Sequence, residues 1–499
     1  MGMKHESISL MKAVDCLRHL PCRRLVAAGL LTGWLFPSHP ALAEEDTPAG
    51  FFHDHFPLTL ENGERTEAAG PFYYSQQTDT ENILAWPPFF SRARRPGVEF
   101  QADDYLYPLC TSIHYGQEKR WQLFELISTA SGLEPDGDRV KRFTLFPLYF
   151  QQRAADTNLD YTAVLPFYGR LKHRLFKDEI RFIMFPGFVE TRKRDVITDN
   201  YFYPFVDVHH GDGMEGWQVW PFVGREHKDV TLRTNGFGDV NLVPGHDHSF
   251  YLWPFYLRQN NGLGTTNLES FRASLPFFAL SRAPQREATS VLWPLFAWID
   301  DRDQQYHEWQ GPWPFVIFAR GEGKHTSRVW PLFSQSHNDT KESDSYAWPC
   351  YTFNWTHADP LDQRRTRVLY FLYSHFSVKN TQTGKERRRV DVWPFFTWHH
   401  DVNGNERLQI LAPIEPAVPD NASLERNWSP LWSLWRSERN PTTGANSQSL
   451  LWNLYRRESA SAHTNCSCLF GLYQSRAQAN EKTVRLFYLP AIHSHSVNP

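Results

Sequence analysis

An aromatic residue followed by proline recurs along most of this 499-residue chain, and this repeat constrains the fold more than any other feature. Eight copies are Trp-Pro pairs. In the best-preserved stretch the prolines stand at positions 276, 294, 314, 331 and 349, with spacings of 18, 20, 17 and 18 residues. Looser copies have Tyr, Phe or Leu before the proline. Such self-similarity is typical of repeat architectures, in which each unit packs on its neighbours.

Each copy has the same internal pattern. In most copies an aliphatic residue stands two before the proline, an aromatic residue stands directly before it, and Phe or Leu follows it. A polar stretch follows, such as Asn403-Gly404-Asn405, and Asn-Gly pairs supply the positive φ angles of hairpin turns. The apolar runs are rich in strand-favouring residues and too short for helices. Because proline cannot donate to a β-ladder, we place each aromatic-Pro pair at a bend between two strands.

The repeat predicts an all-β fold. We expect a tandem β-hairpin repeat of about 20 units, each of roughly 17–24 residues, forming a layered or meander sheet array. The alternative is a large up-and-down β-barrel. Apolar residues on both sides of each corner predict burial on both faces, with Trp293, Trp330 and Trp393 in the core. The rhythm breaks near residues 125–142 and 230–250, and insertions in repeat arrays form loops, often on a binding face.

The first 43 residues have the pattern of a secretory signal peptide. Basic residues precede an apolar stretch at residues 25–36, and Ala41-Leu42-Ala43 is the small-x-small pattern that signal peptidase accepts. The apolar stretch is about half as long as the roughly 20 residues of a spanning helix. We therefore expect a leader at residues 1–43, a single β-repeat domain at residues 44–499, and no transmembrane helix after cleavage.

Composition limits the partners and the redox chemistry. The leader removes more basic than acidic residues, so the remaining chain is acidic and offers no general attraction to nucleic acid. Four cysteines remain, which are too few for a disulfide framework, although export leaves disulfides open. We expect packed thiols at Cys110, Cys350, Cys466 and Cys468.

Several segments resemble an uncharacterised family of exported bacterial proteins with reiterated Trp-Pro-aromatic motifs. The segments are TDNYFYPF at 198–205, GWQVWPF at 216–222, ARGEGKHTSRVWP at 319–331 and SPLWSLWR at 429–436. The resemblance covers nearly the whole chain after the leader. It implies export and repetition, and it implies no activity, ligand or catalytic residue.

The best metal candidate is a group of histidines in and near the second insertion. Its members are His246-Asp247-His248, with His209-His210 or His227. His-x-His on a strand places both imidazoles on one face, an arrangement that metal sites use. Because the chain has 22 histidines, we interpret the segment as a solvent-facing polar loop instead.

Two further patterns carry acidic residues. The stretch Asp401-Val402-Asn403-Gly404-Asn405-Glu406 resembles a calcium loop, but its glycine is out of place, and an Asn-Gly hairpin turn explains it better. Carboxylates near Trp298 and Trp309 have the residue types of a glycosidase pair, but nothing in the sequence fixes their separation. They are Asp300, Asp301, Asp303 and Glu308. No nucleophile-elbow, P-loop or zinc-protease motif stands in a plausible context. We therefore predict no catalytic, cofactor-binding or metal residue, no cofactor, and no enzymatic activity.

Three classes of function fit these patterns. The first is a structural or binding scaffold of the cell envelope, in the periplasm or at the cell surface, whose partner is a polymer, lipid or protein. The second is an outer-membrane β-barrel for transport, against which stand a proline in most units and apolar residues on both faces. The third is a carbohydrate-binding or carbohydrate-active protein. The sequence favours the scaffold.

The predicted leader can be tested directly. N-terminal sequencing of exported protein should begin at Glu44, because cleavage follows Ala43. A mature protein that still contains residues 25–36 would contradict the prediction.

Overall fold

The structure, a computed structural model, describes most of the chain after the predicted leader. The described residues are 51–133, 139–234, 238–460, 463–478 and 481–495. The signal peptide predicted for residues 1–43 lies outside them.

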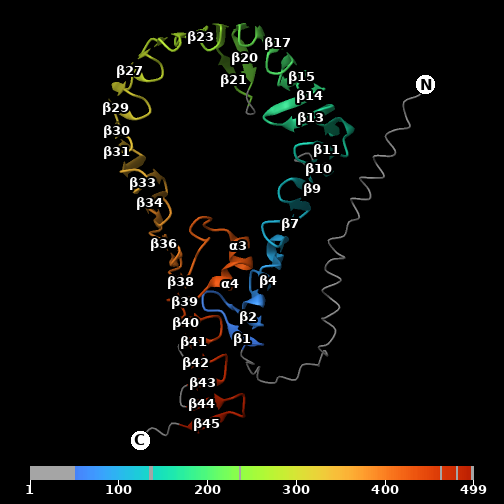
Figure 1. Cartoon of the computed structure of the whole chain (residues 1–499), viewed down its shortest axis with the longest axis vertical. Helices are drawn as coiled ribbons and strands as arrows, with labels where there is room; N and C mark the ends of the chain where they lie inside the picture. The colour runs from blue at the N-terminus through green and yellow to red at the C-terminus, as the bar shows by residue number, and fades with distance from the viewer. Residues whose placement is uncertain (1–50, 134–138, 235–237, 461–462, 479–480, 496–499) are drawn as a thin grey trace, which may run out of the picture. The chain divides into compact units, whose positions relative to one another are not determined.

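Antiparallel β-strands make up nearly all of the described chain. Strands account for 62% of the structure and helices for 4%. In the described part, 43 strands form one sheet, in which nearly every strand pairs with the next along the chain (Figure 1). Among these strands β1 pairs only with β2 and β45 only with β44, so the sheet is open. The prediction of an all-β hairpin meander is confirmed.

The first part of the sheet runs to the second insertion. Its strands are β1 Asp54–Pro57, β2 Gly63–Ala68, β3 Tyr73–Thr78, β4 Asn82–Trp86, β5 Phe90–Arg95, β6 Phe100–Tyr105, β7 Cys110–Tyr115, β8 Glu118–Leu123, β9 Ile127–Leu133, β10 Arg139–Leu145, β11 Tyr149–Arg153, β12 Tyr161–Val164, β13 Tyr168–Arg174, β14 Lys177–Ile183, β15 Phe188–Lys193, β16 Val196–Tyr201, β17 Val206–Gly211, β18 Met214–Val219 and β19 Val223–Lys228.

The sheet continues after the insertion. Its strands are β22 Gly245–Tyr251, β23 Tyr256–Leu263, β24 Glu269–Ser274, β25 Phe278–Arg282, β26 Arg286–Val291, β27 Phe296–Asp301, β28 Tyr306–Gln310, β29 Val316–Gly321, β30 Lys324–Val329, β31 Phe333–Asn338, β32 Lys341–Tyr346, β33 Tyr351–Ala358, β34 Leu361–Val368, β35 Tyr373–Asn380, β36 Glu386–Val392, β37 Phe396–His400 and β38 Glu406–Ile410. Two short helices, α3 Ala422–Asn427 and α4 Ser429–Trp432, precede the last strands. These are β39 Trp435–Asn440, β40 Ala445–Leu450, β41 Tyr455–Ala460, β42 His463–Cys468, β43 Tyr473–Gln478, β44 Glu481–Leu486 and β45 Ile492–His495.

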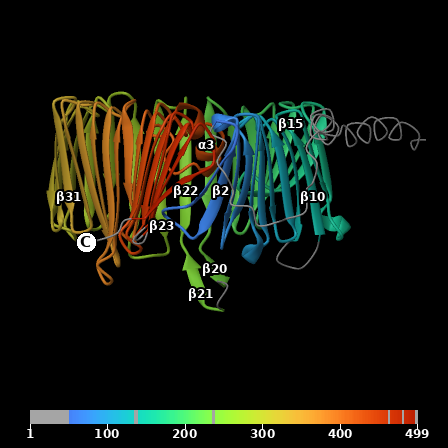
Figure 2. The same cartoon turned by 90° about the horizontal axis from the view of Figure 1, so that it is seen from below.

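The two insertions predicted from the sequence differ in structure. Residues 125–142 include β9 and the start of β10, which pair with each other in the main sheet. Residues 230–250 contain β20 Thr231–Thr234 and β21 Val240–Val243, which form a separate two-stranded sheet. This hairpin extends beyond the ends of the neighbouring strands (Figure 2). Across its base β19 pairs directly with β22, so the main sheet continues without it.

The turns of the sheet alternate between two rims of different chemistry. Every second turn carries an aromatic-Pro or related apolar sequence, such as Trp330-Pro331-Leu332 between β30 and β31. In a meander of hairpins every second turn lies at the same edge, so these segments form one rim, here called the aromatic rim. The other turns, such as Asp339-Thr340 between β31 and β32, form the polar rim. The prediction that aromatic-Pro pairs stand at corners between strands is confirmed.

Hydrogen bonds join each turn of the aromatic rim to the preceding one. The Trp330 N–H donates to the Phe315 carbonyl at 2.7 Å, and the Leu292 N–H donates to the Phe277 carbonyl at 2.7 Å. Proline removes a donor but keeps its carbonyl, and the Pro331 carbonyl accepts from the Trp348 N–H at 2.8 Å. The strand ladder therefore continues through the corners.

One face of the sheet carries an unbroken row of directly paired residues. Such pairs point to the same side of a sheet, and the register connects this row from Asp54 in β1 to Arg485 in β44. In almost every strand its member is the second residue from the aromatic rim. We call it the buried row, because many of the least exposed residues belong to it. Among these are Tyr74, Ala85, Ser91, Asp104, Ala163, Phe182, Val189, Asn200, Asp207, Ala273, Ala279, Ala297, Ile317, Asp391, Thr397 and Gln409.

The predicted burial of the corner tryptophans is wrong for two of the three. Trp293 is 45% exposed and Trp330 is 38% exposed. Trp393 is half-buried, and its indole N–H donates to the Pro413 carbonyl at 2.9 Å. The reason is that the described strands form a single main sheet, so no second sheet layer covers these turns. Neighbouring rings instead contact one another, as Trp330 and Trp348 do with centroids 5.6 Å apart.

Close packing in the buried row can be tested at a glycine. A Cβ on Gly169 in β13 would lie 2.4 Å from the Ala163 Cβ and 2.5 Å from the Phe182 ring. Gly169→Ala should therefore destabilise the protein by about 1–3 kcal/mol, as overpacking does. Thermal unfolding followed by circular dichroism measures the loss.

Gly97, in the turn between β5 and β6, provides the matched control. A Cβ there would meet nothing within 4 Å. Gly97→Ala should change stability by less than about 0.5 kcal/mol. Equal effects of the two substitutions would contradict the close packing of the buried row.

Candidate functional site

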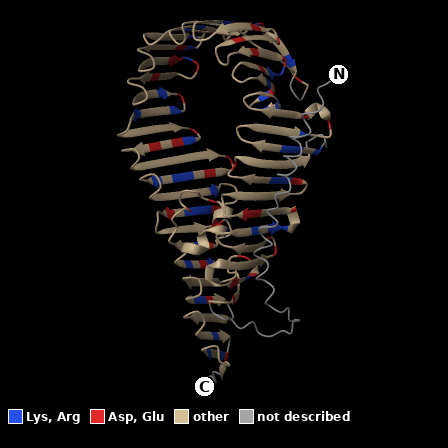
Figure 3. Cartoon of the chain, turned by 45° about the vertical axis from the view of Figure 1, so that its right-hand side comes forward, with Lys and Arg blue, Asp and Glu red and all other residues tan. Residues whose placement is uncertain are grey.

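The aromatic rim presents a long surface without charged residues. Between β10 and β37 none of its turn segments contains Asp, Glu, Lys or Arg. These segments are 146–148, 165–167, 184–187, 202–205, 220–222, 252–255, 275–277, 292–295, 311–315, 330–332, 347–350, 369–372 and 393–395. Many of their side chains are strongly exposed, including Phe222 at 61% and Phe277 at 65%. Charged residues of both signs instead lie along the strands (Figure 3). Exposed apolar surface on this scale marks an interaction site.

Two grooves lie between the aromatic rim and the strands behind it. One has a volume of about 280 Å³ and is lined by Trp220 and Trp253, whose ring centroids are 5.7 Å apart. The other has a volume of about 500 Å³ and is lined by Trp330 and Trp348. Both add polar side chains from the strands. In the larger groove these are Arg328, Ser334, Ser343, Asp344, Ser345, Thr352, Asn354 and Arg367.

A cluster of histidines surrounds Glu226 in the smaller groove. Glu226 of β19 is directly opposite His248 of β22, and its Oε1 lies 3.6 Å from the His248 Nδ1. The same oxygen lies 2.5 Å from the His246 Nε2, and the His246 and His248 rings stack with centroids 4.4 Å apart. On the other side, the His209 Nε2 lies 3.1 Å from the Glu226 Oε2. The cluster joins strands β17, β19 and β22.

Electrostatic coupling within this cluster shifts the pKa of several members. Hydrogen bonds to Asp207 and Glu226 raise the pKa of His209 to about 9. The pKa of His248 is also raised, mainly by Glu226, and the histidines hold the pKa of Glu226 well below its usual value. In the absence of another cation, the site is a carboxylate that histidines neutralise.

The predicted histidines lie on opposite faces of the sheet. His209, His246 and His248 come together on one face of the sheet. His210 and His227 are adjacent in sequence to His209 and Glu226, and they point to the opposite face. The segment 246–248 is part of β22, so its interpretation as a loop is wrong.

Sequence reasoning missed Glu226, which is the centre of this cluster. No spacing motif links it to the histidines, because its partners belong to other strands. The only signal would have been the strand register.

A second trio, His337, Glu342 and Asp344, offers one imidazole and two carboxylates.

The other acidic candidates serve the turns of the polar rim. Asp401 begins the turn between β37 and β38, and its side chain accepts the backbone N–H groups of Asn403 at 2.7 Å and Asn405 at 3.0 Å. This is the hairpin turn that the Asn-Gly pair predicts. Asp300 is directly opposite His307, whereas Glu308 points to the other face, so these two carboxylates do not face a common site.

Asp301 and the four cysteines have structural positions of their own. Asp301 accepts the backbone N–H of Asp303 at 3.1 Å within the turn after β27. None of the four cysteines in the described chain forms a disulfide, and Cys110 is buried. Cys350 lies in an uncovered turn of the aromatic rim and is exposed, so the prediction of a packed thiol is wrong there. The Cys466 and Cys468 sulfur atoms lie 3.9 Å apart.

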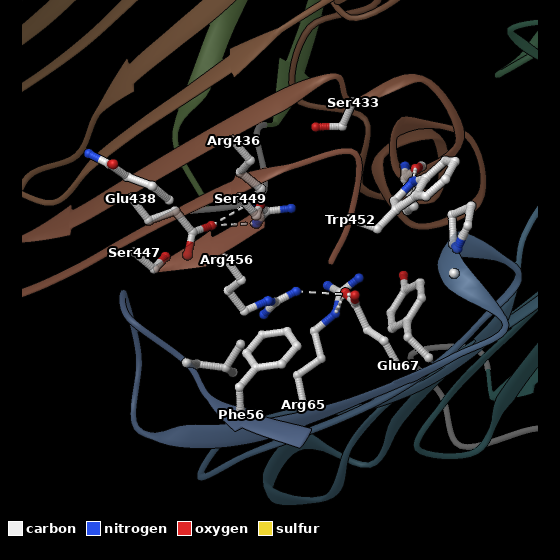
Figure 4. Close-up of a pocket in the computed structure, with 16 residues that line it drawn as sticks. Phe56, Arg65, Glu67, Ser433, Arg436, Glu438, Ser447, Ser449, Trp452 and Arg456 are labelled. Carbon is white, nitrogen blue, oxygen red and sulfur yellow. Dashed lines mark hydrogen bonds and ion pairs between the residues drawn. The ribbon is translucent and has the colours of Figure 1, made fainter. Parts of the chain in front are cut away.

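A network of charged residues joins the first strands of the sheet to the last ones (Figure 4). Arg456 of β41 contacts Asp54 at 3.3 Å and Glu67 at 3.2 Å, and its guanidinium lies over the Phe56 ring. A second link is made by Arg426 of α3, which donates to Asp104 of β6 at 2.9 Å. The cavity beside Arg456 has a volume of only about 70 Å³, far below that of a typical ligand pocket. This junction therefore stabilises the fold rather than binding a ligand.

Known proteins offer no guide to this site. Neither the comparison with protein families nor the search of curated proteins finds a match. The resemblance to exported Trp-Pro repeat proteins therefore stays a prediction, supported by the quoted motifs.

The junction predicts a dependence of stability on pH. Burial raises the pKa of Glu458, which lies 3.6 Å from Arg456, to about 7. The folded protein thus keeps a proton that the unfolded chain releases near pH 4.5, and this stabilisation is lost as the pH rises towards 7. Glu458→Gln cannot ionise, so its stability relative to the natural chain should rise by about 2.5 kcal/mol between pH 5 and pH 8. Thermal unfolding across this range measures the difference.

The exposed Glu322 of the polar rim offers a matched control. Glu322→Gln should show the same small difference from the natural chain at every pH, since exposed substitutions change little. If the stability difference between Glu458→Gln and the natural chain did not change with pH, the raised pKa of Glu458 would be refuted.

Proposed function

We propose that this chain is a non-enzymatic scaffold of the cell envelope that attaches to a membrane surface through its aromatic rim. The observation that carries the proposal is the rim itself, a succession of turns with exposed Phe, Leu and Trp and no charged residue. Soluble monomers rarely expose apolar surface of this extent.

The chemistry of the rim favours lipid as its occupant. Trp and Tyr are enriched where proteins meet the membrane interface, and Phe and Leu prefer the acyl region below it. Burying one such side chain completely contributes about 1.5–3 kcal/mol, so a few inserted turns suffice for attachment. The acidic chain gains no general attraction to anionic headgroups, which leaves apolar insertion as the driving force.

The distribution of polar groups supports an oriented attachment. Charged and polar residues occupy the opposite rim and the strands between the rims (Figure 3). In the proposed arrangement the aromatic rim enters the interface and the polar rim faces water. Among the described residues no helix is long and apolar enough to cross a membrane. The leader predicted for residues 1–43 supports an envelope location.

A second candidate function, glycan binding, has its own observation. Each groove behind the rim places two tryptophans beside polar strand residues, and aromatic faces with nearby hydrogen-bonding groups suit sugar rings. The Trp330 and Trp348 rings are tilted by 44° to each other, so they do not form the flat platform that stacked sugars prefer. We therefore favour lipid over glycan as the ligand of the aromatic rim.

Co-sedimentation with phosphatidylcholine vesicles tests the proposal. The intact chain should bind, and binding should change little with salt, because apolar insertion drives it. Replacing Phe222 and Phe277 together by Ser should weaken binding about 100-fold or more, because two inserted side chains together contribute about 3–6 kcal/mol.

The control uses the same change at the opposite rim. Phe176, in the turn between β13 and β14, is 98% exposed on the polar rim. Phe176→Ser should leave vesicle binding unchanged. Equal losses for both variants, or binding to insoluble polysaccharide without binding to vesicles, would overturn the lipid proposal.

A further inference from the structure

The two carboxylate oxygens of Glu226 face different histidines. Oε1 faces the His246 Nε2 at 2.5 Å and the His248 Nδ1 at 3.6 Å, whereas Oε2 faces the His209 Nε2 at 3.1 Å. One ligand atom from each of Glu226, His246 and His248 lies within 4.8 Å of the others. One carboxylate oxygen and two imidazole nitrogens therefore lie close enough together to hold one metal ion.

This donor set fits zinc better than the harder cations. Calcium and magnesium prefer oxygen ligands alone, whereas two imidazoles and one carboxylate are a common set for Zn²⁺. With metal–ligand bonds of about 2.0–2.2 Å, tetrahedral ligand atoms lie roughly 3.3–3.5 Å apart. The separations of Glu226 from His246 and from His248, 2.5 Å and 3.6 Å, bracket this value, and the two imidazole nitrogens lie within 4.8 Å of each other. Side-chain rotations would bring the three atoms to the tetrahedral spacing.

The surrounding residues already orient two of the rings. The His248 Nε2 donates to the Asn261 Oδ1 at 2.7 Å, which holds a hydrogen on Nε2 and leaves Nδ1 facing Glu226 as the nitrogen that a metal would bind after displacing its proton. The His209 Nδ1 bonds to Asp207 at 3.1 Å, which directs the His209 Nε2 towards Oε2, the Glu226 oxygen that does not face His246 and His248. Metal sites use outer partners of this kind to fix ring orientation and tautomer.

A glycine makes room for this arrangement. Gly216 of β18 lies between His209 and Glu226 in the register. A Cβ at Gly216 would lie only 2.0 Å from the His209 Nε2. The imidazole therefore crosses the bare backbone of β18 to reach Glu226 on the next strand, which a side chain at position 216 would prevent.

We propose that Glu226, His246 and His248 bind one Zn²⁺ ion, with His209 and Asn261 as positioning residues. Three protein ligands leave a fourth position of the tetrahedron. Glu226 and His248 also line the groove that contains Trp220 and Trp253, so a water or a ligand group in that groove can take this position. The metal site does not depend on the aromatic rim and stands apart from the proposed membrane attachment.

Equilibrium dialysis of the purified full chain against ZnCl₂ tests the site. We expect one tightly bound Zn²⁺ per chain. His246→Gln and His248→Gln should each weaken binding on the order of 100-fold, since each removes one of three ligands. Substitution with Co²⁺ should give the visible absorption of a four-coordinate ion, and His248→Gln should abolish it.

The positioning residues give a second readout. Gly216→Ala should weaken Zn²⁺ binding about 10- to 100-fold although it removes no ligand, as outer-partner changes do. If this variant fails to fold by circular dichroism, Asn261→Ala provides the same test through His248. His337→Gln, in the other histidine–carboxylate trio, is the matched control and should leave binding unchanged.

Three outcomes would overturn the proposal. They are no Zn²⁺ binding by the intact chain, full binding by both His246→Gln and His248→Gln, and loss of binding in His337→Gln. The rim variant with Phe222 and Phe277 replaced should bind Zn²⁺ normally, so failure of the metal site and failure of the membrane proposal are distinguishable.

Discussion

The hydrogen bond between consecutive aromatic turns sets the geometry on which the rest of this sheet depends. Each turn donates a backbone N–H to the carbonyl of the preceding turn, as Trp330 does to Phe315. This bond fixes the register of each new hairpin at its corner. A slip of one residue would move every side chain of a strand to the other face. The repeated corner therefore keeps the same side of the sheet buried from β1 to β44.

The fixed register also separates the chemistry of the molecule by position. Small residues such as Ala163 and Ala297 occupy the buried row, where neighbouring side chains approach closely. Near the ends of the sheet, charged members of the same row, Asp54 and Arg456, face each other in the junction. The larger apolar side chains stand at the aromatic rim, where no sheet layer covers them. A common backbone pattern thus produces a packed face, a charged contact and an exposed apolar edge.

Much of the architecture could be predicted from the sequence, because its determinants are local. The Trp-Pro period, the Asn-Gly turns and the short apolar runs define the hairpins and their corners. The exposure of Trp293 and Trp330 could not be predicted, because an apolar corner has the same sequence whether or not a second layer covers it. The site around Glu226 was missed for a different reason. The register of β17, β18 and β19 brings His209, Gly216 and Glu226 together. His248 joins them only because β19 pairs with β22 across the insertion, and no local pattern specifies that pairing.

The β20–β21 hairpin illustrates how such a chain can change its length. It leaves and returns at the polar rim, and the strands on either side of it pair as though it were absent. An added segment of this kind disturbs neither the buried row nor the corners, because both are defined by pairs of adjacent strands. The array can therefore be extended, shortened or given an extra hairpin one unit at a time, without any change in the pairing of the strands on either side.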